Sequence, residues 1–236
     1  MKNSSPSFKK SLKYTLTFLL LIWLIEACKH HFHLPLHYLG IYPQSAFGLI
    51  GVITAPLIHG SWEHVINNSA ALLLLGTLLL YSYSTTRWKA LAIVWLVSGL
   101  GVWLFGRPSF HYGASGLTHG IFYYLLVSGI LRRDKRSVGV LMIAFFMYGS
   151  MLLTILPQRP EISFEAHFFG GLGGVIATLL LFRKESKPKE KTYEWEGRPE
   201  EDDPFIGDEW QGEENSALRE IEDVDTKHNK ANETEY

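Results

Sequence analysis

Three short segments of this 236-residue chain combine polar side chains with glycine in otherwise apolar sequence: HGSWEHVINN at 59–68, HYGASGLTHG at 111–120 and SFEAHFFGGLGG at 163–174. A serine hydroxyl becomes a strong nucleophile when a histidine lies within about 2.6–3.2 Å and takes its proton. These residue types predict an acyl-transfer site in which Ser115 is the nucleophile and His167 is the general base.

The segment at 59–68 supplies groups suited to binding an oxyanion. His64 and Asn68 are four residues apart, so both project from one face of a helix. Ser115 begins another expected helix, where backbone N–H groups are unpaired and the helix dipole favours negative charge. We expect the two side chains and the Ser115 N–H to stabilise the oxyanion.

Glycines favour a close approach of the helices that carry Ser115 and His167. Gly170 and Gly174 share a helical face with His167, and Gly116 follows Ser115. Such stripes let helix axes come closer than the usual 8–10 Å or so. If these two faces pack, the histidine lies beside the serine.

No carboxylate is expected to orient the general base. Glu63 and Glu165 each adjoin a histidine in the sequence, and adjacent residues of a helix point in different directions. The pattern therefore predicts a Ser–His dyad and not a triad.

The elements that must position these residues are membrane-spanning helices, each of which needs roughly 20 mostly apolar residues, or somewhat fewer when neighbours shield it. Six stretches qualify: 14–28, 62–81, 90–105, 115–131, 138–156 and 164–182. They predict an all-α polytopic membrane protein with a six-helix body at 14–183. In that topology His64, Asn68, Ser115 and His167 fall at one depth near one face of the membrane.

Charge is distributed unevenly along the chain. Sixteen of the 23 Asp and Glu residues lie at 194–236, which predicts a disordered acidic tail at 184–236 after the body. With the N-terminal segment 1–13 in the cytoplasm, 15 of the Lys and Arg residues up to Lys191 fall on the cytoplasmic side and three on the other. The positive-inside rule then predicts cytoplasmic termini, and places the polar cluster near the outer face of a cell (inner) membrane. The run LIEACKHHF lacks a signal-peptide cleavage site, so the first helix is expected to be retained.

Other interpretations of these residues stay open. GASG and the glycine stripe are also typical of simple helix packing in membranes. A metal- or haem-binding bundle would use the ten histidines, four of which cluster as His30, His31, His33 and His37. HExxH is absent and Cys28 is the single cysteine, so neither a zinc protease nor an internal disulfide is indicated. We expect no metal, no cofactor and no nucleic-acid partner.

Together the three segments resemble the rhomboid family of intramembrane serine proteases. The family's histidine, histidine and asparagine pattern, its GxSG motif and its AHxxGxxxG motif appear here in order as His59, His64, Asn68, Gly113, Ser115, Gly116, His167, Gly170 and Gly174.

The resemblance implies that Ser115 attacks the scissile carbonyl, with His167 as base and then acid. It implies an oxyanion hole of His64, Asn68 and the Ser115 N–H, and a structural role for His59 in holding an external loop. The implied substrates are single-span membrane proteins cut near the outer face. The alternative is a catalytically silent rhomboid-like protein that binds membrane helices. The oligomeric state is not indicated.

Two positions depart from the family pattern. Many rhomboids carry a Trp-x-Arg pair in the first external loop, where this chain has Leu49 and Gly51. This raises the question of how that loop is anchored. Members also usually place Tyr or Phe four residues after the nucleophile, to stack on the catalytic imidazole, and here that residue is His119.

We predict that activity changes between about pH 5 and pH 8, where histidine titrates, and that His119 contributes to the change. The measurement is the pH profile of cleavage for the wild type and for His119→Phe. Superimposable profiles would dismiss the contribution of His119.

Overall fold

A computed structural model of the chain describes residues 7–157 and 162–186. All regular elements in these ranges are helical, and a single isolated bridge joins two loops. The expected acidic tail lies outside the described residues from residue 187 onward, as do residues 1–6 of the N-terminal segment.

The elements follow one another in the order α1 (Phe8–His31), η1 (Leu36–Leu39), η2 (Phe47–Ile50), α2 (Gly51–Thr54), η3 (Ala55–Leu57), α3 (Trp62–Ala71), η4 (Leu72–Gly76), α4 (Thr77–Ser82), α5 (Arg87–Phe105), α6 (Ser115–Arg132), α7 (Lys135–Tyr148), η5 (Gly149–Leu152) and α8 (Phe164–Leu181). The π-helical segment η4 joins α3 to α4, so 62–82 is one continuous helical stretch.

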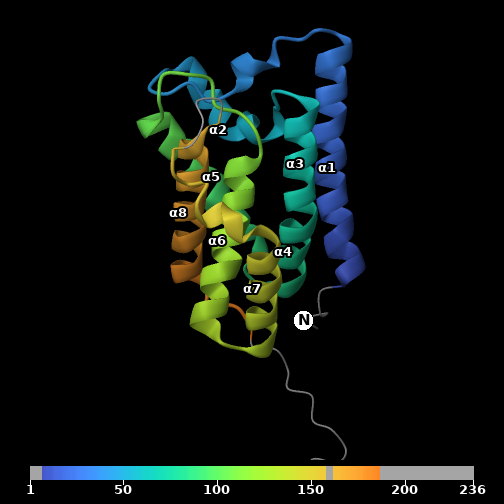
Figure 1. Cartoon of the computed structure of the whole chain (residues 1–236), viewed down its shortest axis with the longest axis vertical. Coiled ribbons are helices and arrows are strands. Elements are labelled where there is room, and N and C mark those ends of the chain that lie inside the picture. The colour runs from blue at the N-terminus through green and yellow to red at the C-terminus, as the bar shows by residue number, and fades with distance from the viewer. Residues whose placement is uncertain (1–6, 158–161, 187–236) are drawn as a thin grey trace, which may run out of the picture. The chain divides into compact units, whose positions relative to one another are not determined.

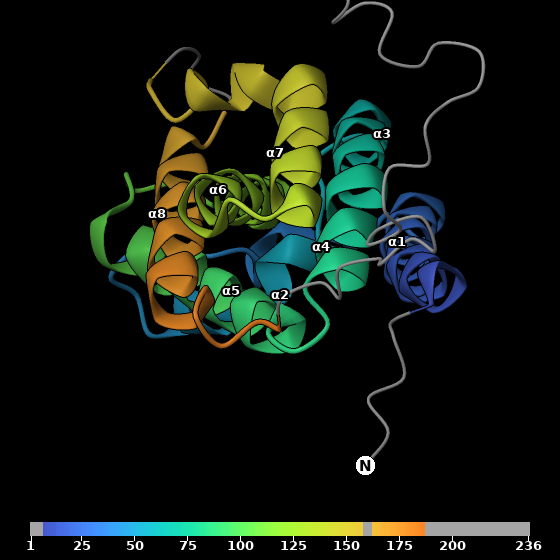
Figure 2. The same ribbon diagram turned by 90° about the horizontal axis from the view of Figure 1, so that it is seen from below.

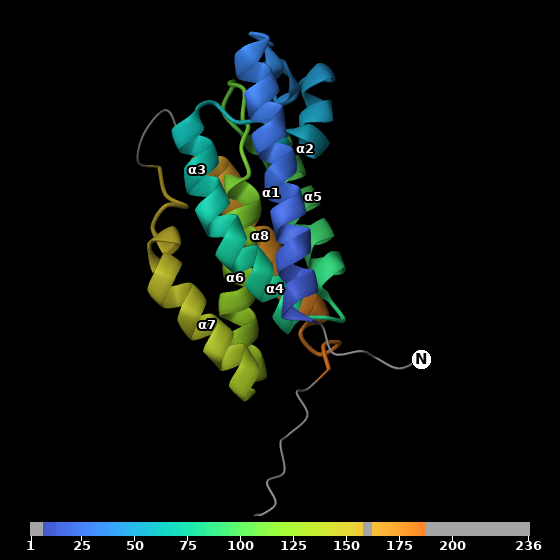
Figure 3. The ribbon, with the colours of Figure 1, turned by 90° about the vertical axis from the view of Figure 1, so that its right-hand side faces the viewer.

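The chain is a polytopic helical membrane protein, as predicted. Phe8–His31, Trp62–Ser82, Arg87–Phe105 and Phe164–Leu181 are each long and apolar enough to cross a membrane. The helices α6 and α7 complete the bundle, which Figures 1 and 3 show from two sides. We call its two ends the Ser115 end and the Arg132 end, after the first and last residues of α6. The described chain begins and finishes at the Arg132 end (Figure 1).

The fifth span is shorter than its hydropathy predicts. The prediction of a helix to Leu156 is wrong at its C-terminal end, because α7 stops at Tyr148. The 3₁₀ turn Gly149–Leu152 and a further turn follow, and they include Thr154. Residues 151–156 are almost all apolar, so hydropathy alone does not register the point at which the chain turns.

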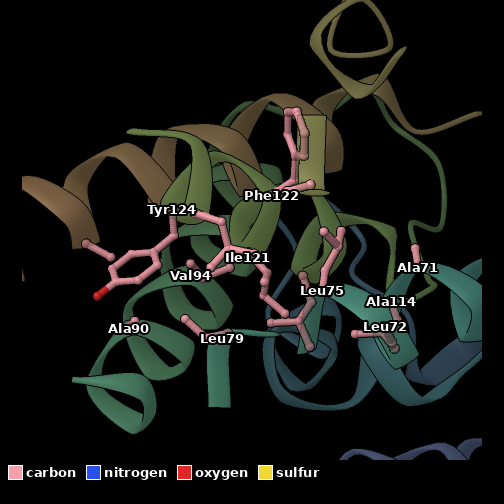
Figure 4. Packing of buried hydrophobic residues seen from close by; sticks show 14 of the residues in the cluster. Ala71, Leu72, Leu75, Leu79, Ala90, Val94, Ala114, Ile121, Phe122 and Tyr124 are labelled. Carbon is pink, nitrogen blue, oxygen red and sulfur yellow. The ribbon is translucent and has the colours of Figure 1, made fainter. Parts of the chain in front are cut away.

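Helix α6 lies in the middle of the bundle, with α5, α7, α8 and the α3–α4 stretch around it (Figure 2). Most of its residues are buried. Figure 4 shows Ile121 and Tyr124 of α6 on the side of Val94 and Leu75, and Phe122 pointing to the opposite side. Because lipid is as apolar as these side chains, their close packing stabilises the bundle mainly through van der Waals contact.

Glycines hold α6 and α8 backbone to backbone. A methyl group added at Gly170 would lie 2.8 Å from the carbonyl carbon of Gly116 and would overlap its oxygen. One at Gly174 would overlap the carbonyl oxygen of Gly120. The glycine faces predicted from the sequence therefore pack against each other.

A polar network closes the Arg132 end. The Glu185 carboxylate accepts hydrogen bonds from the backbone N–H groups of Thr85 and Thr86, at 3.1 and 2.9 Å, and from the Thr86 hydroxyl at 2.8 Å. Arg132 donates to the carbonyl oxygens of Phe182 and Glu185, at 2.7 and 3.0 Å. The end of α8 is thereby tied to α6 and to the turn before α5.

We predict that Gly170→Ala lowers the free energy of unfolding by about 1–3 kcal/mol, because the added methyl group forces α6 and α8 apart. Gly139→Ala on α7 is the matched control, since nothing lies within 4 Å of a methyl group there. That control should be neutral, or stabilising by up to about 1 kcal/mol. Thermal unfolding in detergent measures both variants, and equal effects would contradict the prediction.

Candidate active site

The loop before α6 delivers Ser115 to the first position of that helix. His111 exchanges two backbone hydrogen bonds with Ile41, both 2.8 Å, and the Gly113 N–H donates to the Ala55 carbonyl at 2.9 Å. Gly113 has a φ of +118°, which L side chains rarely adopt. The half-buried Ser115 is thus held at a helix N-terminus by a loop pinned to the segment before α3.

His64 and Asn68 meet at Gly113. A methyl group at Gly113 would lie 2.5 and 2.7 Å from His64 Cε1 and Nε2, and 3.7 Å from Asn68 Nδ2. Asn68 Nδ2 is buried and has no hydrogen-bond partner among the described residues. Six other buried side-chain atoms of the described residues share this condition, but Asn68 Nδ2 is the one that lies with His64 against Gly113. The two side chains predicted for the oxyanion hole therefore lie together, two residues before the predicted nucleophile.

His59 also contacts the loop before α6. Its Nε2 accepts a hydrogen bond from the backbone N–H of Ala114 at 3.3 Å. Lys29, which is ion-paired with Glu26 at 2.7 Å, donates to the His59 carbonyl. Burial, followed by the neighbouring charge of His64, lowers the pKa of His59 to about 3, so its ring is neutral at physiological pH.

His167 and His119 form a stacked pair. The ring centroids are 3.9 Å apart and the planes differ by 10°. His167 Nδ1 lies 2.9 Å from the Thr154 carbonyl, and His119 Nδ1 lies 2.7 Å from the Ser115 carbonyl. A carbonyl only accepts, so each Nδ1 carries a proton. Neutral His167 is left with an unprotonated Nε2, as a general base requires.

The Ser115 hydroxyl and His167 are brought into one region without a direct bond. Gly116 and Ala166, the neighbours of these two residues, are in contact, since a methyl group at Gly116 would lie 3.0 Å from the Ala166 carbonyl oxygen. Across the described residues, however, no hydrogen bond joins the Ser115 hydroxyl to the His167 ring. Catalytic hydrogen bonds in unliganded enzymes are often long and tighten when substrate binds.

The start of α8 is fastened to the loop before α6. Ser163 caps the helix by accepting from the Ala166 N–H at 3.2 Å, and its hydroxyl lies 2.7 Å from His111 Nδ1. Arg107 pairs with Glu165 at 2.8 Å. Burial lowers the pKa of His111, which keeps the ring neutral and able to accept from Ser163. The segment that leads into α6 is therefore joined to the start of α8 by a side-chain hydrogen bond and an ion pair.

Comparison with known proteins agrees with this architecture. The Rhomboid domain model matches residues 46–184 of the chain. The chain belongs to the rhomboid family. Uncharacterized proteins of Mycobacterium tuberculosis and Mycobacterium bovis are each 38% identical to it over 184 residues, which is 74% of this chain and 76% of theirs. An uncharacterized protein of Mycobacterium leprae is 34% identical over 188 residues, 75% of this chain and 72% of its own length.

At Gly51, where many rhomboids carry the arginine of the Trp-x-Arg pair, this rhomboid has no room for a side chain. A methyl group at Gly51 would overlap the backbone of Gly40 and Ile41, because the first residue of α2 packs directly against that segment. Leu49, at the tryptophan position, is exposed.

Two tryptophans of α5 anchor the loop instead. Trp103 Nε1 donates to the Ser45 carbonyl at 2.9 Å, and Trp95 Nε1 donates to the Val52 carbonyl at 3.0 Å. The indole N–H is a donor only, so each pair is unambiguous. In this rhomboid the first loop is therefore attached to α5 through backbone acceptors.

Three of the four histidines considered as metal ligands, His30, His31 and His37, take part in ring packing. His30 contacts the ring of Trp62 edge-on, and His37 packs on Tyr38 and Phe110. In residues 7–157 and 162–186 no group of three His, Cys, Asp or Glu side chains is placed to hold a metal ion.

Several site residues were missed by sequence reasoning. Thr154 acts through its carbonyl and its hydroxyl, whereas Trp95 and Trp103 donate their indole N–H groups to backbone carbonyls, and such contacts carry no motif. Glu26 and Lys29 had a detectable signal, since an acidic residue within an apolar span is costly and usually functional. Glu26 is buried beneath the loop that holds His59.

We predict that the rhomboid fold loses stability as the pH falls from about 6.5, because protonating His59 abolishes its bond from the Ala114 N–H. The native pKa is below the unfolded value, so the unfolded state binds more protons in this window and stability falls with decreasing pH. For each pH unit below about 6.5, the free energy of unfolding of the wild type should fall by about 1.4 kcal/mol more than that of His59→Gln. Parallel pH dependences of thermal unfolding in the two proteins would contradict the prediction.

Proposed function

We propose that this rhomboid is an active intramembrane serine endopeptidase. Ser115 is the nucleophile, His167 is the general base and then the general acid, and His64, Asn68 and the Ser115 N–H form the oxyanion hole. Gly113, Gly116, Gly170 and Gly174 permit the close packing that the site needs.

The observation that carries the proposal is the buried Asn68 Nδ2, which has no partner among the described residues and lies with His64 against Gly113. An oxyanion hole requires a donor that awaits its acceptor, and this donor lies unpaired against Gly113, two residues along the chain from Ser115. The backbone N–H of Ser115 is a third donor, because N–H groups in the first turn of a helix have no carbonyl partner within that helix.

The proposed reaction follows from these groups. The Ser115 oxygen attacks the scissile carbonyl carbon as its proton passes to His167 Nε2, and the oxyanion is held by the three donors. The C–N bond then breaks and His167 returns the proton to the leaving amine, which yields the acyl-enzyme. Water, deprotonated by His167, hydrolyses the ester and frees Ser115.

The proposed substrates are single-span membrane proteins. In a regular helix the peptide carbonyls are engaged in internal hydrogen bonds, so a cleavable segment must unwind at the Ser115 end of the bundle. The basic residues at the Arg132 end favour its placement in the cytoplasm, with both termini there and the site near the outer face of the cell membrane.

One observation favours a second candidate function. Without a Ser115–His167 hydrogen bond among the described residues, the chain also suits a silent rhomboid-like protein that binds membrane helices and does not cut them.

We expect the wild type to cleave a reconstituted single-span substrate, and Ser115→Ala and His167→Ala to lose about 10³-fold or more in rate. Ser150→Ala is the control, because Ser150 is an exposed serine in the turn after α7 and its side chain is outside the site. Labelling by a serine-directed fluorophosphonate should disappear in Ser115→Ala alone. Full activity in either dyad variant would exclude the dyad, and substrate capture without cleavage by the wild type would favour the silent protein.

A further inference from the structure

Thr154 contacts both imidazoles of the stacked pair. Its carbonyl oxygen lies 2.9 Å from His167 Nδ1, and its hydroxyl oxygen lies 2.8 Å from His119 Nε2. Neither helix of the stacked pair carries Thr154, which lies in the turn that follows α7 and η5. One residue of a loop thus holds two rings that come from two different helices.

The direction of each hydrogen bond follows from what its partner can donate. The Ser115 carbonyl, 2.7 Å from His119 Nδ1, only accepts, so that nitrogen is protonated. Nε2 of neutral His119 is then an acceptor, and the Thr154 hydroxyl must donate to it. The alternative acceptor for that hydroxyl, the Met151 carbonyl, is farther away at 3.3 Å.

We propose that Thr154 is a positioning residue for the general base, an inference that rests on the proposed function. Its carbonyl holds His167 in the tautomer that leaves Nε2 unprotonated. Its hydroxyl keeps the His119 ring stacked on the His167 ring and favours the neutral form of His119. In a Ser–His–Asp site a carboxylate orients the base, whereas here a threonine performs this task without a charge.

The neutral state of His119 matters for the chemistry. When His167 accepts the serine proton, a positively charged ring forms 3.9 Å from the centre of its stacking partner. A second positive charge at that distance would oppose the transfer. By donating to His119 Nε2, the Thr154 hydroxyl favours the uncharged ring and hence an easier transfer.

The turn itself is built to present Thr154. Its backbone N–H and that of Leu153 both bond to the Ser150 carbonyl, at 3.3 and 3.0 Å, and the Leu156 N–H bonds to the Leu153 carbonyl at 3.2 Å. The position of the base thus depends on a turn that the hydropathy pattern had assigned to a membrane helix.

The test is a double-mutant cycle in the full-length chain. Thr154→Val keeps the shape and the carbonyl but removes the hydroxyl, and we expect kcat to fall about three- to tenfold with KM unchanged. Thr154→Ser, which retains the hydroxyl, should restore kcat. In a His119→Phe background Thr154→Val should have no further effect, because the hydroxyl has lost its partner. Ser150→Ala, in the same turn, is the matched control.

Nitrogen NMR of the histidine rings provides a readout that does not depend on proteolysis. The wild type should show Nδ1–H tautomers at both His119 and His167, and Thr154→Val should change the His119 signals. An unchanged kcat with unchanged ring signals in Thr154→Val would overturn the proposal, as would an equal loss in the His119→Phe background. If Thr154→Val does not fold, an Nε2–H tautomer of His167 in the wild type would overturn it. If the wild type does not cleave, the proposed function fails and the ring signals alone decide the role of Thr154.

Discussion

The direct contact between the backbones of α6 and α8 is the constraint on which the rest of the site depends. A methyl group at Gly170 would overlap the backbone of Gly116, and one at Gly116 would lie 3.0 Å from the Ala166 carbonyl oxygen, so main-chain atoms set the distance between the two helices. Main-chain contacts are stiffer than contacts between long side chains, which have several rotamers. Ser115 adjoins Gly116, and His167 adjoins Ala166, whose carbonyl oxygen faces Gly116, so both residues are positioned with little freedom.

Around this contact the structure relies on neutral backbone acceptors where many hydrolases use charge. The carbonyl of Ser115 orients His119, and the carbonyl of Thr154 orients His167. In a low-dielectric bundle a buried carboxylate needs a partner to offset its desolvation, whereas a carbonyl already belongs to the chain. Among the described residues, two buried carboxylates are ion-paired, Glu165 with Arg107 and Glu26 with Lys29, and a third, Glu185, accepts hydrogen bonds from Thr85 and Thr86.

The two ends of the bundle are stabilised in different ways. The Arg132 end is closed by one compact network, in which Glu185 and Arg132 tie α8 to α6 and to the turn before α5. The Ser115 end is assembled from several loops, which are joined through Ile41, His111 and Ser163 and anchored by the indoles of α5. Loops that carry function on a rigid scaffold are a general arrangement, and here the scaffold is the glycine-packed helix pair.

The sequence by itself determined the all-α membrane class, the helices that carry His64, Asn68, Ser115 and His167, and the glycine faces that bring α6 and α8 together. Hydrophobic periods, span lengths and motif spacing are local properties of the chain, so they can be read without coordinates. Only the tertiary structure decided the early end of α7, the stacking of His119 on His167, the role of Trp95 and Trp103 as loop anchors, and the place of Thr154 between the rings. The physical reason is that these features rest on backbone carbonyls and on contacts between distant segments. Every residue carries such a carbonyl, so its presence in the sequence does not distinguish one position from another.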